Sequence, residues 1–260
     1  MHKIPCNVCG EKREFDEIHK DRASGLRVVR CRGCGLIFVN PTFTPHEHLE
    51  YYSSIHWSEF PTAGTGSYSF IPPEQVEHWE KRAKAHIDYL ATFYAPVKEG
   101  RRIHVLEVGC GYAAHLEELK RRCPEASLAA VEPNRRIYAI IRKRMPKTQI
   151  LGKTIETLGG GRMLFDCIIA VDVLERTVDP TTALRRIHTM LGHDGRCLIV
   201  THNAAGRSGS VYDLSQLYYF TEGTLAPLFR KCRLDLVRQD IRGETGLAGD
   251  DRIYNILSKK

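Results

Sequence analysis

Apolar runs and amphipathic segments alternate along the chain after Gly100. Short runs rich in Val, Ile, Leu and Ala, bounded by glycine, proline or polar residues, are typical of buried strands. They predict strands at 103–108, 127–131, 148–151, 165–171, 195–201, 233–240 and 252–258. Helical periodicity between them predicts helices at 112–122, 134–144, 180–191 and 221–231. This alternation predicts an α/β fold with a doubly wound, mostly parallel seven-stranded sheet, whose last two strands form an antiparallel hairpin at one edge.

A further helix is predicted from Glu74 to Tyr94, ahead of the first strand of this sheet. Its larger or less polar residues recur at intervals of three and four, namely Val76, Trp79, Ala83, His86, Leu90 and Phe93. We interpret this stripe as the face that packs on the core. Arg82 lies off the stripe and is either solvated or turned toward a ligand.

Two CxxC pairs near the N-terminus indicate a metal site, Cys6 with Cys9 and Cys31 with Cys34. Two residues between thiols let a tight turn aim both sulfurs at one ion, and Gly10 and Gly35 follow the pairs directly. The doubled motif favours a zinc ribbon at 1–45 over a redox centre. The zinc would be structural, because four thiolates leave it no open position for catalysis. Residues 46–73, rich in Pro, Gly, Ser and aromatics, are expected to form a linker or lid, and 74–260 the main domain.

Composition excludes only a few classes of function. The 260 residues carry a formal net charge of +7, a mild excess that permits an acidic partner without requiring one. No apolar run approaches the length that spans a bilayer, and no membrane partner is expected. The N-terminus has no apolar stretch typical of a signal peptide, and nine cysteines do not suggest a disulfide framework. We therefore expect a cytoplasmic protein.

The segment VLEVGCGYA suggests a ligand site at the end of the first strand of the main domain. Ligands of such sheets bind beyond the carboxyl ends of the strands, where Gly109 and Gly111 permit close backbone approach. Neither the three-glycine dinucleotide fingerprint nor a P-loop is present. Glu107 suits a ligand with an ammonium group, and Glu132, at the end of the second strand, suits the two hydroxyls of a ribose. These features fit S-adenosylmethionine better than NAD.

Taken in order, the segments VLEVGCGYA, AVEPN, FDCIIAVDVLERTVDP and LGHDGRCLIV resemble the successive motifs of class I S-adenosylmethionine-dependent methyltransferases. The resemblance covers roughly residues 74–240. CRGCGLIFVNPTFTPHEHLEYY is similar to the zinc-ribbon head of a subgroup that includes sugar and natural-product methyltransferases. The resemblance implies a Rossmann-like methyltransferase sheet, S-adenosylmethionine as cofactor and a structural zinc ion.

The resemblance also implies roles for individual residues. Glu107, Gly109 and Gly111 would line the methionine end of the cofactor, with Tyr112 covering it, and Glu132 would hold the ribose. The remaining residues would flank the ribose, adenine or sulfonium, namely Pro133, Asn134, Thr154, Ile155, Glu156, Asp172, Val173 and Leu174. For Glu156, a capping or solvated acid is an equal alternative.

The residue that removes a proton from the acceptor is less clear from the pattern. Relatives often carry histidine where this chain has Arg176 and Gln216. His202, directly after the fifth strand, is the histidine placed to serve as base, with a structural role as its alternative. Arg176 stays protonated and is expected to bind an anionic group of the acceptor.

The expected function is therefore methyl transfer to a small-molecule acceptor, such as a sugar, a nucleotide-linked sugar or a secondary metabolite. One alternative is an RNA methyltransferase whose ribbon binds nucleic acid. It is less favoured, because the basic stretch after Glu132 has few interleaved aromatics. A second alternative is a cofactor-binding module without catalysis, suggested by Arg176 and Gln216.

Overall fold

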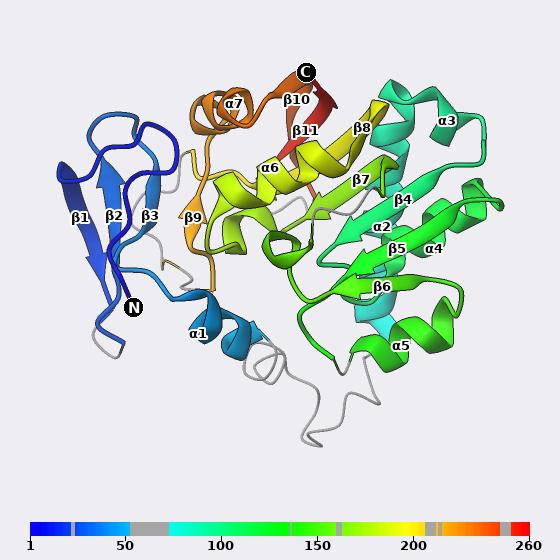
Figure 1. Ribbon diagram of the computed structural model, residues 1–260, viewed down its shortest axis with the longest axis horizontal. Helices are drawn as coiled ribbons and strands as arrows, with labels where there is room; N and C mark the ends of the chain where they lie inside the picture. Colours follow the sequence, from blue (N-terminus) through cyan, green and yellow to red (C-terminus); the bar gives the residue numbers. More distant parts are fainter. Residues whose placement is uncertain are drawn as a thin grey trace.

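Seven strands form the central sheet within the described part of the computed structural model (Figure 1). The described residues are 1–21, 24–52, 73–135, 137–159, 163–205, 212, 215–244 and 251–260. The strands are β4 (His104–Val108), β5 (Ser127–Val131), β6 (Gln149–Gly152), β7 (Phe165–Val171), β8 (Leu191–His202), β10 (Leu234–Gly243) and β11 (Asp251–Lys259). Their order is β10-β11-β8-β7-β4-β5-β6. The first five strands in sequence pair in parallel, whereas β11 is antiparallel to both β8 and β10. The predicted doubly wound sheet is confirmed.

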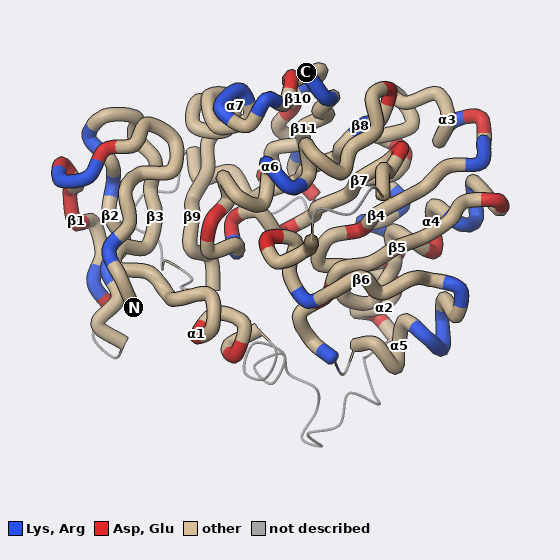
Figure 2. Tube along the Cα trace, viewed as in Figure 1, with Lys and Arg blue, Asp and Glu red and all other residues tan. Residues whose placement is uncertain are grey.

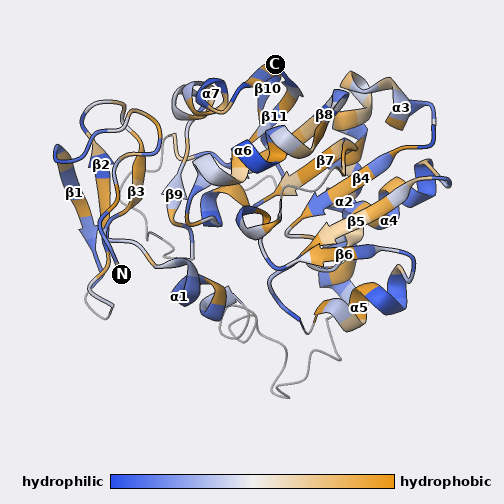
Figure 3. Cartoon of the chain, in the orientation of Figure 1, coloured by the Kyte–Doolittle hydropathy of each residue, from blue (hydrophilic) through white to orange (hydrophobic). Residues whose placement is uncertain are grey.

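Helices cover both faces of this sheet because the strand residues alternate between two buried layers. On one face pack α2 (Pro73–Phe93), α3 (Ala95–Lys98), α4 (Ala114–Arg122) and α5 (Ile137–Arg144), and on the other α6 (Pro180–Met190) and α7 (Glu222–Lys231). Within β4, Val105 belongs to the first layer and Leu106 to the second. Figure 3 shows the resulting apolar centre of the sheet beneath helices with hydrophilic outer faces. No helix among the described residues is both long and apolar enough to cross a membrane.

The N-terminal part forms a second, four-stranded antiparallel sheet. Its strands are β1 (Phe15–Lys20), β2 (Arg27–Cys31), β3 (Ile37–Val39) and β9 (Tyr218–Tyr219). β9 comes from the segment between β8 and α7, so the ribbon sheet is completed by the main part of the chain. Phe38 of β3 stacks on Tyr218 with ring centroids 6.2 Å apart, and both are fully buried. One hydrophobic layer therefore runs from the ribbon into the main domain.

The segment after the ribbon is described only in its first part. It contains α1 (Pro45–Glu50), which begins at a capping box formed by Thr44 and Glu47. The predicted aromatic loop lies almost entirely at 53–72, outside the described residues. The division into 1–45, 46–73 and 74–260 remains a prediction, because contact between two parts does not tell whether each folds alone.

Candidate active site

The turn between β4 and α4 is shaped by its two glycines. Gly109 has φ +68° and donates its N–H to the Val131 carbonyl at 2.7 Å. A Cβ on Gly109 would come within 2.5 Å of a methyl carbon of Val173, so a side chain does not fit. Gly111 has φ +46° and donates to Glu132 Oε2 at 3.0 Å. Because β4 pairs in parallel with both β5 and β7, the turn lies where the carboxyl ends of these three strands meet.

A cavity of about 430 Å³ lies at this edge of the sheet. Twelve of the predicted site residues line it: Glu107, Gly109, Gly111, Tyr112, Glu132, Pro133, Thr154, Ile155, Glu156, Asp172, Val173 and Arg176. Its size is within the range typical of small-molecule sites. The structure therefore brings most of the sequence-predicted residues to one place.

Three predicted residues are not among the described residues that line the cavity. Asn134 is fully buried, and its backbone N–H donates to Glu132 Oε1 at 2.8 Å. Leu174 is buried in the hydrophobic layer that reaches the ribbon. His202 lies behind Asp172, as described below. Asn134 and Leu174 are thus placed to support residues that line the cavity, and their predicted contacts with a ligand remain predictions.

Glu132 is a buried acid with a specific hydrogen-bonding arrangement. Only 2% of the residue is exposed, and its two oxygens accept the backbone N–H groups of Gly111 and Asn134. Burial raises the pKa of Glu132 to about 7, although the two backbone donors oppose the shift. Each carboxylate oxygen keeps a lone pair for a further donor, which is what the paired hydroxyls of a ribose supply.

Glu107 has one occupied and one unoccupied oxygen. Its Oε1 lies 2.7 Å from His115 Nδ1, and its Oε2 is buried with no hydrogen-bond partner among the described residues. Burial raises the pKa of this carboxyl. An orphaned buried oxygen on the wall of a cavity calls for a donor from a ligand. An ammonium group fits this position.

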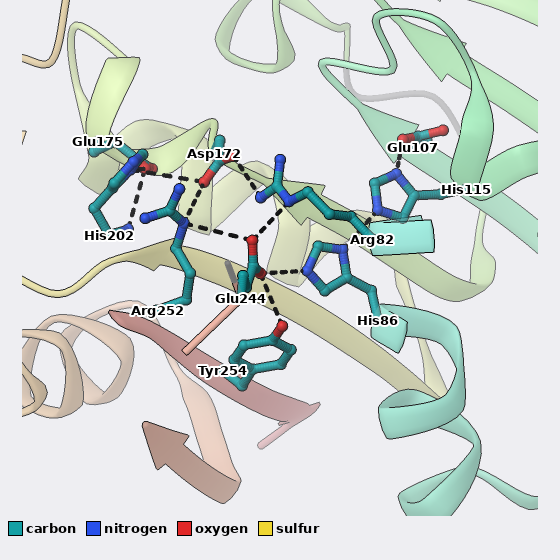
Figure 4. Close-up of polar contacts among 10 residues, drawn as sticks. All are labelled: Arg82, His86, Glu107, His115, Asp172, Glu175, His202, Glu244, Arg252 and Tyr254. Carbon is teal, nitrogen blue, oxygen red and sulfur yellow. Dashed lines mark hydrogen bonds and ion pairs between the residues drawn. The ribbon is translucent and has the colours of Figure 1, made fainter. Parts of the chain in front are cut away.

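A network of buried and partly buried polar side chains extends from Glu107 to Glu244 and Asp172 (Figure 4). It comprises His115 of α4, Arg82 and His86 of α2, and Glu244, which directly follows β10. Arg82 donates to Glu244 Oε2 at 2.6 Å and to Asp172 Oδ2 at 2.9 Å, so it faces the site rather than solvent. His86 was interpreted from the sequence as a core position, and it is buried, but as a hydrogen-bonding group. The partners lie far apart in sequence, so no local pattern signals them.

The other end of the network surrounds Asp172, which has φ +54° just after β7. Its Oδ1 lies 3.4 Å from Arg252 Nε and 3.7 Å from His202 Nδ1, and His202 Nδ1 lies 2.9 Å from Glu175 Oε1. Asp172, Glu175 and His202 have ligand-type atoms within 4.8 Å of one another. Two arginine side chains already supply positive charge to Asp172, however, so this cluster is better explained as an ion-pair network than as a cation site.

Arg176 and His48 both line the cavity and lie in contact with each other. Arg176 Nη1 donates to Ser215 Oγ at 2.7 Å, which fixes the guanidinium at the cavity wall. His48 of α1 also lines the cavity, and its Nε2 lies 2.5 Å from the Arg176 carbonyl oxygen. Because a carbonyl only accepts, Nε2 carries the proton and Nδ1 keeps a lone pair. Burial lowers the pKa of His48 to about 4, so the ring is neutral. The sequence analysis assigned no role to His48, which stands in the six-residue helix α1.

The tyrosines that precede α7 pack against other residues of the protein rather than line the cavity. Tyr218 and Tyr219 are at most 4% exposed, and Tyr212 packs on Tyr219 with ring centroids 5.1 Å apart. None of the three is among the described residues that line the cavity. Their placement indicates a packing role.

The four ribbon cysteines lie together as predicted, Cys6, Cys9, Cys31 and Cys34. The Sγ atoms of Cys6 and Cys34 are 3.5 Å apart and those of Cys9 and Cys31 are 3.4 Å apart. Tetrahedral zinc with Zn–S bonds of about 2.3 Å places sulfurs about 3.8 Å apart. Gly10 and Gly35 have φ +82° and +79°, and the backbone amide of Val8 donates to the Cys6 sulfur. The donor set and its spacing fit zinc.

The basic segment after Glu132 forms the exposed side of α5 (Figure 2). Arg142 and Lys143 are exposed. Arg144 is bound by Glu117 and Glu80, and its guanidinium carbon lies 3.9 Å from the centre of the Tyr112 ring. Part of the basic charge is therefore used within the protein, in keeping with a solvated helix face.

One family model and several solved structures are similar to this chain. A family model described as a methyltransferase domain matches residues 77–238. The solved structure of 1,6-didemethyltoxoflavin-N1-methyltransferase from Burkholderia thailandensis is 20% identical, with a TM-score of 0.60 over 95% of this chain and 99% of that chain. Magnesium protoporphyrin IX methyltransferase from Synechocystis PCC 6803 is 12% identical, with a TM-score of 0.59 over 85% and 100%. No curated protein sequence matches the chain.

Proposed function

The chain belongs to the methyltransferase-domain family, and from this premise we propose that it transfers a methyl group from S-adenosylmethionine to a small-molecule acceptor beside Arg176. The observation that carries the proposal is the pair of buried carboxylates, Glu107 and Glu132, on one cavity wall at the ends of adjacent strands. The orphaned Glu107 oxygen suits the cofactor's ammonium, and Glu132 suits its ribose. The two solved structures, with bound S-adenosylhomocysteine and S-adenosylmethionine respectively, support the same cofactor.

When bound, the cofactor supplies an electrophilic methyl group on a positively charged sulfur. The protein has to hold the acceptor in line with that methyl group and receive any proton that the acceptor loses. Arg176 is proposed to fix an anionic group of the acceptor, since its planar guanidinium matches carboxylate or phosphate. Trp79 and Tyr52 also line the cavity and offer flat surfaces for a ring. Four sulfurs at zinc-like spacing support the proposal that the ribbon holds structural zinc.

Two histidines are candidates for the base. His202 is the sequence-based candidate, and its contact with Glu175 leaves Nε2 as the free acceptor if Nδ1 donates. His48 is the candidate that the structure adds, because it lines the cavity with an unprotonated Nδ1. Methylation of a hydroxyl makes its proton strongly acidic, so even a weakly basic imidazole is sufficient to receive it.

We expect His48→Gln to lower kcat by about 100-fold or more, because general bases contribute on the order of 10² to 10⁴. The glutamine amide keeps a donor for the Arg176 carbonyl and removes the base. His202→Gln is the matched variant, and we expect a drop of about tenfold or less. Initial rates on an acceptor found by screening, with S-adenosylhomocysteine affinity as control, provide the measurement. The opposite ranking would assign the base to His202.

Binding of the adenosine part is expected to strengthen as pH rises. Burial raises the pKa of Glu132 to about 7, so the carboxyl is mostly protonated at pH 6 and mostly ionised at pH 8. Two ribose hydroxyls donate best to the ionised form, and affinity should therefore rise about tenfold over this range. Titration with 5′-methylthioadenosine, which lacks the amino acid, isolates this effect from Glu107. A pH-independent affinity would contradict the ribose role of Glu132.

Direct titration calorimetry with S-adenosylmethionine and S-adenosylhomocysteine tests the cofactor assignment. Transfer of labelled methyl groups to a panel of small anionic and neutral acceptors, with RNA as a separate arm, then tests the acceptor class. Labelling of anionic small molecules, lost in Arg176→Met, supports the proposal. Labelling of RNA alone would replace the small-molecule acceptor, and cofactor binding without transfer in any arm would favour a binding module.

A further inference from the structure

Two histidines connect Glu107 to a second buried carboxylate, that of Glu244 (Figure 4). Glu107 Oε1 lies 2.7 Å from His115 Nδ1, His115 Nε2 lies 2.9 Å from His86 Nδ1, and His86 Nε2 lies 2.6 Å from Glu244 Oε1. The imidazole rings are stacked with centroids 5.2 Å apart. The side chains of His86, Glu107 and Glu244 are at most 5% exposed, and that of His115 is 14% exposed. The four groups form a chain with little access to water.

This chain needs three protons. Each of its three short contacts joins two atoms that bear lone pairs, so each contact requires one hydrogen between them. Two neutral imidazoles supply only two protons if both carboxylates are ionised. Without a third proton, one contact would place two lone pairs against each other at 2.6 to 2.9 Å in a buried site. The free protein therefore holds one more proton in this chain than its neutral histidines provide.

The third proton resides at the Glu107 end. Glu244 is ionised, because Arg82 and Tyr254 also donate to it and, with His86, hold its pKa well below the ordinary range. Burial lowers the pKa of His86 to about 4, which disfavours a second proton there. Burial raises the pKa of Glu107. All three shifts favour a proton between Glu107 Oε1 and His115 Nδ1.

A ligand ammonium requires the opposite state of Glu107, since it donates to an ionised carboxylate. We propose that His115 and His86 are positioning residues that take up the Glu107 proton when the cofactor's ammonium group binds at Oε2. The O–H bond of Glu107 breaks, an N–H bond forms at His115 Nδ1, and the imidazolium charge is shared with His86. No proton leaves the protein, and every contact in the chain keeps its hydrogen. This inference rests on the cofactor assignment made above.

The surroundings of the chain can stabilise the shared charge. Its neighbours carry both signs of charge and come from several packed elements. Glu244 is contacted by Arg82 of α2, Tyr254 of β11 and Arg252, and Arg82 in turn pairs with Asp172. Cys110 and Glu132 lie near Glu107. The ion pair of Glu244 with Arg82 leaves the second Glu244 oxygen facing His86. An imidazolium formed in the pair therefore has a carboxylate at each end.

Infrared difference spectroscopy and calorimetry on the unmodified protein test the proposal. S-adenosylhomocysteine carries the ammonium group, and 5′-methylthioadenosine is the matched probe without it. Both engage Glu132, so their difference isolates Glu107. We expect S-adenosylhomocysteine, but not 5′-methylthioadenosine, to remove the carbonyl stretch of one protonated carboxylic acid, a band that Glu107→Gln lacks. Proton release, measured in buffers of different ionisation enthalpy, should be equal for the two ligands.

Each other result overturns the inference in a recognisable way. Loss of the band together with extra proton release would send the proton to solvent instead of the histidines. No band specific to S-adenosylhomocysteine would mean that Glu107 is already ionised. Binding of neither ligand would remove the cofactor assignment itself, which is a separate failure.

Variants test the positioning role. We expect His115→Leu to weaken S-adenosylhomocysteine binding about tenfold or more, because Glu107 loses a charge-assisted hydrogen bond. Binding of 5′-methylthioadenosine should stay unchanged, which also shows that the variant is folded. His115→Asn, which keeps a donor for Glu107, should restore most of the affinity. His188→Leu, in α6 and not among the described residues that line the cavity, is the control. Equal loss of both ligands in His115→Leu would indicate a merely structural role.

Discussion

Replacing Glu132 by alanine is expected to weaken S-adenosylhomocysteine binding by about 1 to 3 kcal/mol, a factor of about 5 to 150. The carboxylate loses its bonds to two ribose hydroxyls, each of which is charge-assisted. Its removal also leaves the Gly111 and Asn134 N–H groups without their acceptor, which loosens the glycine turn. Calorimetric titration of the variant and the unmodified protein at pH 8, where Glu132 is ionised, measures this change in binding free energy.

Glu156→Ala is the matched control for this experiment. Glu156 also lines the cavity, but it accepts no hydrogen bond from the turn that carries Gly109 and Gly111. We expect the affinity of the Glu156→Ala variant for S-adenosylhomocysteine to change by less than about threefold. Thermal unfolding of both variants separates loss of a ligand contact from loss of the fold. If a folded Glu132→Ala variant bound S-adenosylhomocysteine with unchanged affinity, Glu132 would not bind the ribose. A larger loss of affinity in Glu156→Ala would assign the ribose to Glu156 instead.

Removing zinc from the ribbon is expected to unfold residues 1–45 while S-adenosylhomocysteine binding persists. Structural zinc sites contribute roughly 10 to 16 kcal/mol of apparent binding free energy, which a sheet of three short strands cannot replace. The predicted cofactor residues lie at the ends of β4 to β7, whereas the ribbon pairs with β9. Hydrogen exchange after chelation, together with metal analysis, should show loss of protection in β1 to β3 first.

Cys31→Ser and Cys197→Ser form a matched pair for this prediction. Both thiols are buried, but only Cys31 belongs to the four-sulfur cluster. We expect Cys31→Ser to lose zinc and the ribbon, and Cys197→Ser to keep both. Loss of S-adenosylhomocysteine binding in step with zinc would contradict independent folding of 74–260. A purified protein that contains no zinc would contradict the metal assignment.

The ribbon and the main domain share one hydrophobic layer, so unfolding of the ribbon also affects the part of the main domain that packs on it. Phe38 stacks on Tyr218, and Asn7 donates to the Tyr218 hydroxyl at 3.1 Å. Once the ribbon unfolds, Tyr218 loses its contacts with Phe38 and Asn7 and becomes more exposed to solvent. We therefore expect the acceptor side, near Ser215 and Arg176, to become more exchangeable than the cofactor side.

Features that depend on neighbours in sequence could be predicted from the sequence. Strand and helix periodicity fixed the seven strands of the sheet, because a residue's side of a strand or helix follows from its position alone. The two CxxC pairs located the four-cysteine cluster, since a two-residue spacing holds both thiols on one turn. Glu107, Gly109 and Glu132 could be placed at one cavity because parallel strands end at the same edge of a sheet.

Tertiary structure decided the features that join distant segments. Glu107, His115, His86 and Glu244 come from β4, α4, α2 and the residue after β10, and no spacing rule connects them. His48 lines the cavity, where its Nε2 binds the carbonyl of Arg176, 128 residues away in sequence. Likewise, β9 pairs with the ribbon although it has only two residues, and two residues are too few to show a strand pattern in the sequence. The sequence alone thus determined the framework and the strand-end carboxylates, whereas packing determined which buried polar groups meet and share protons.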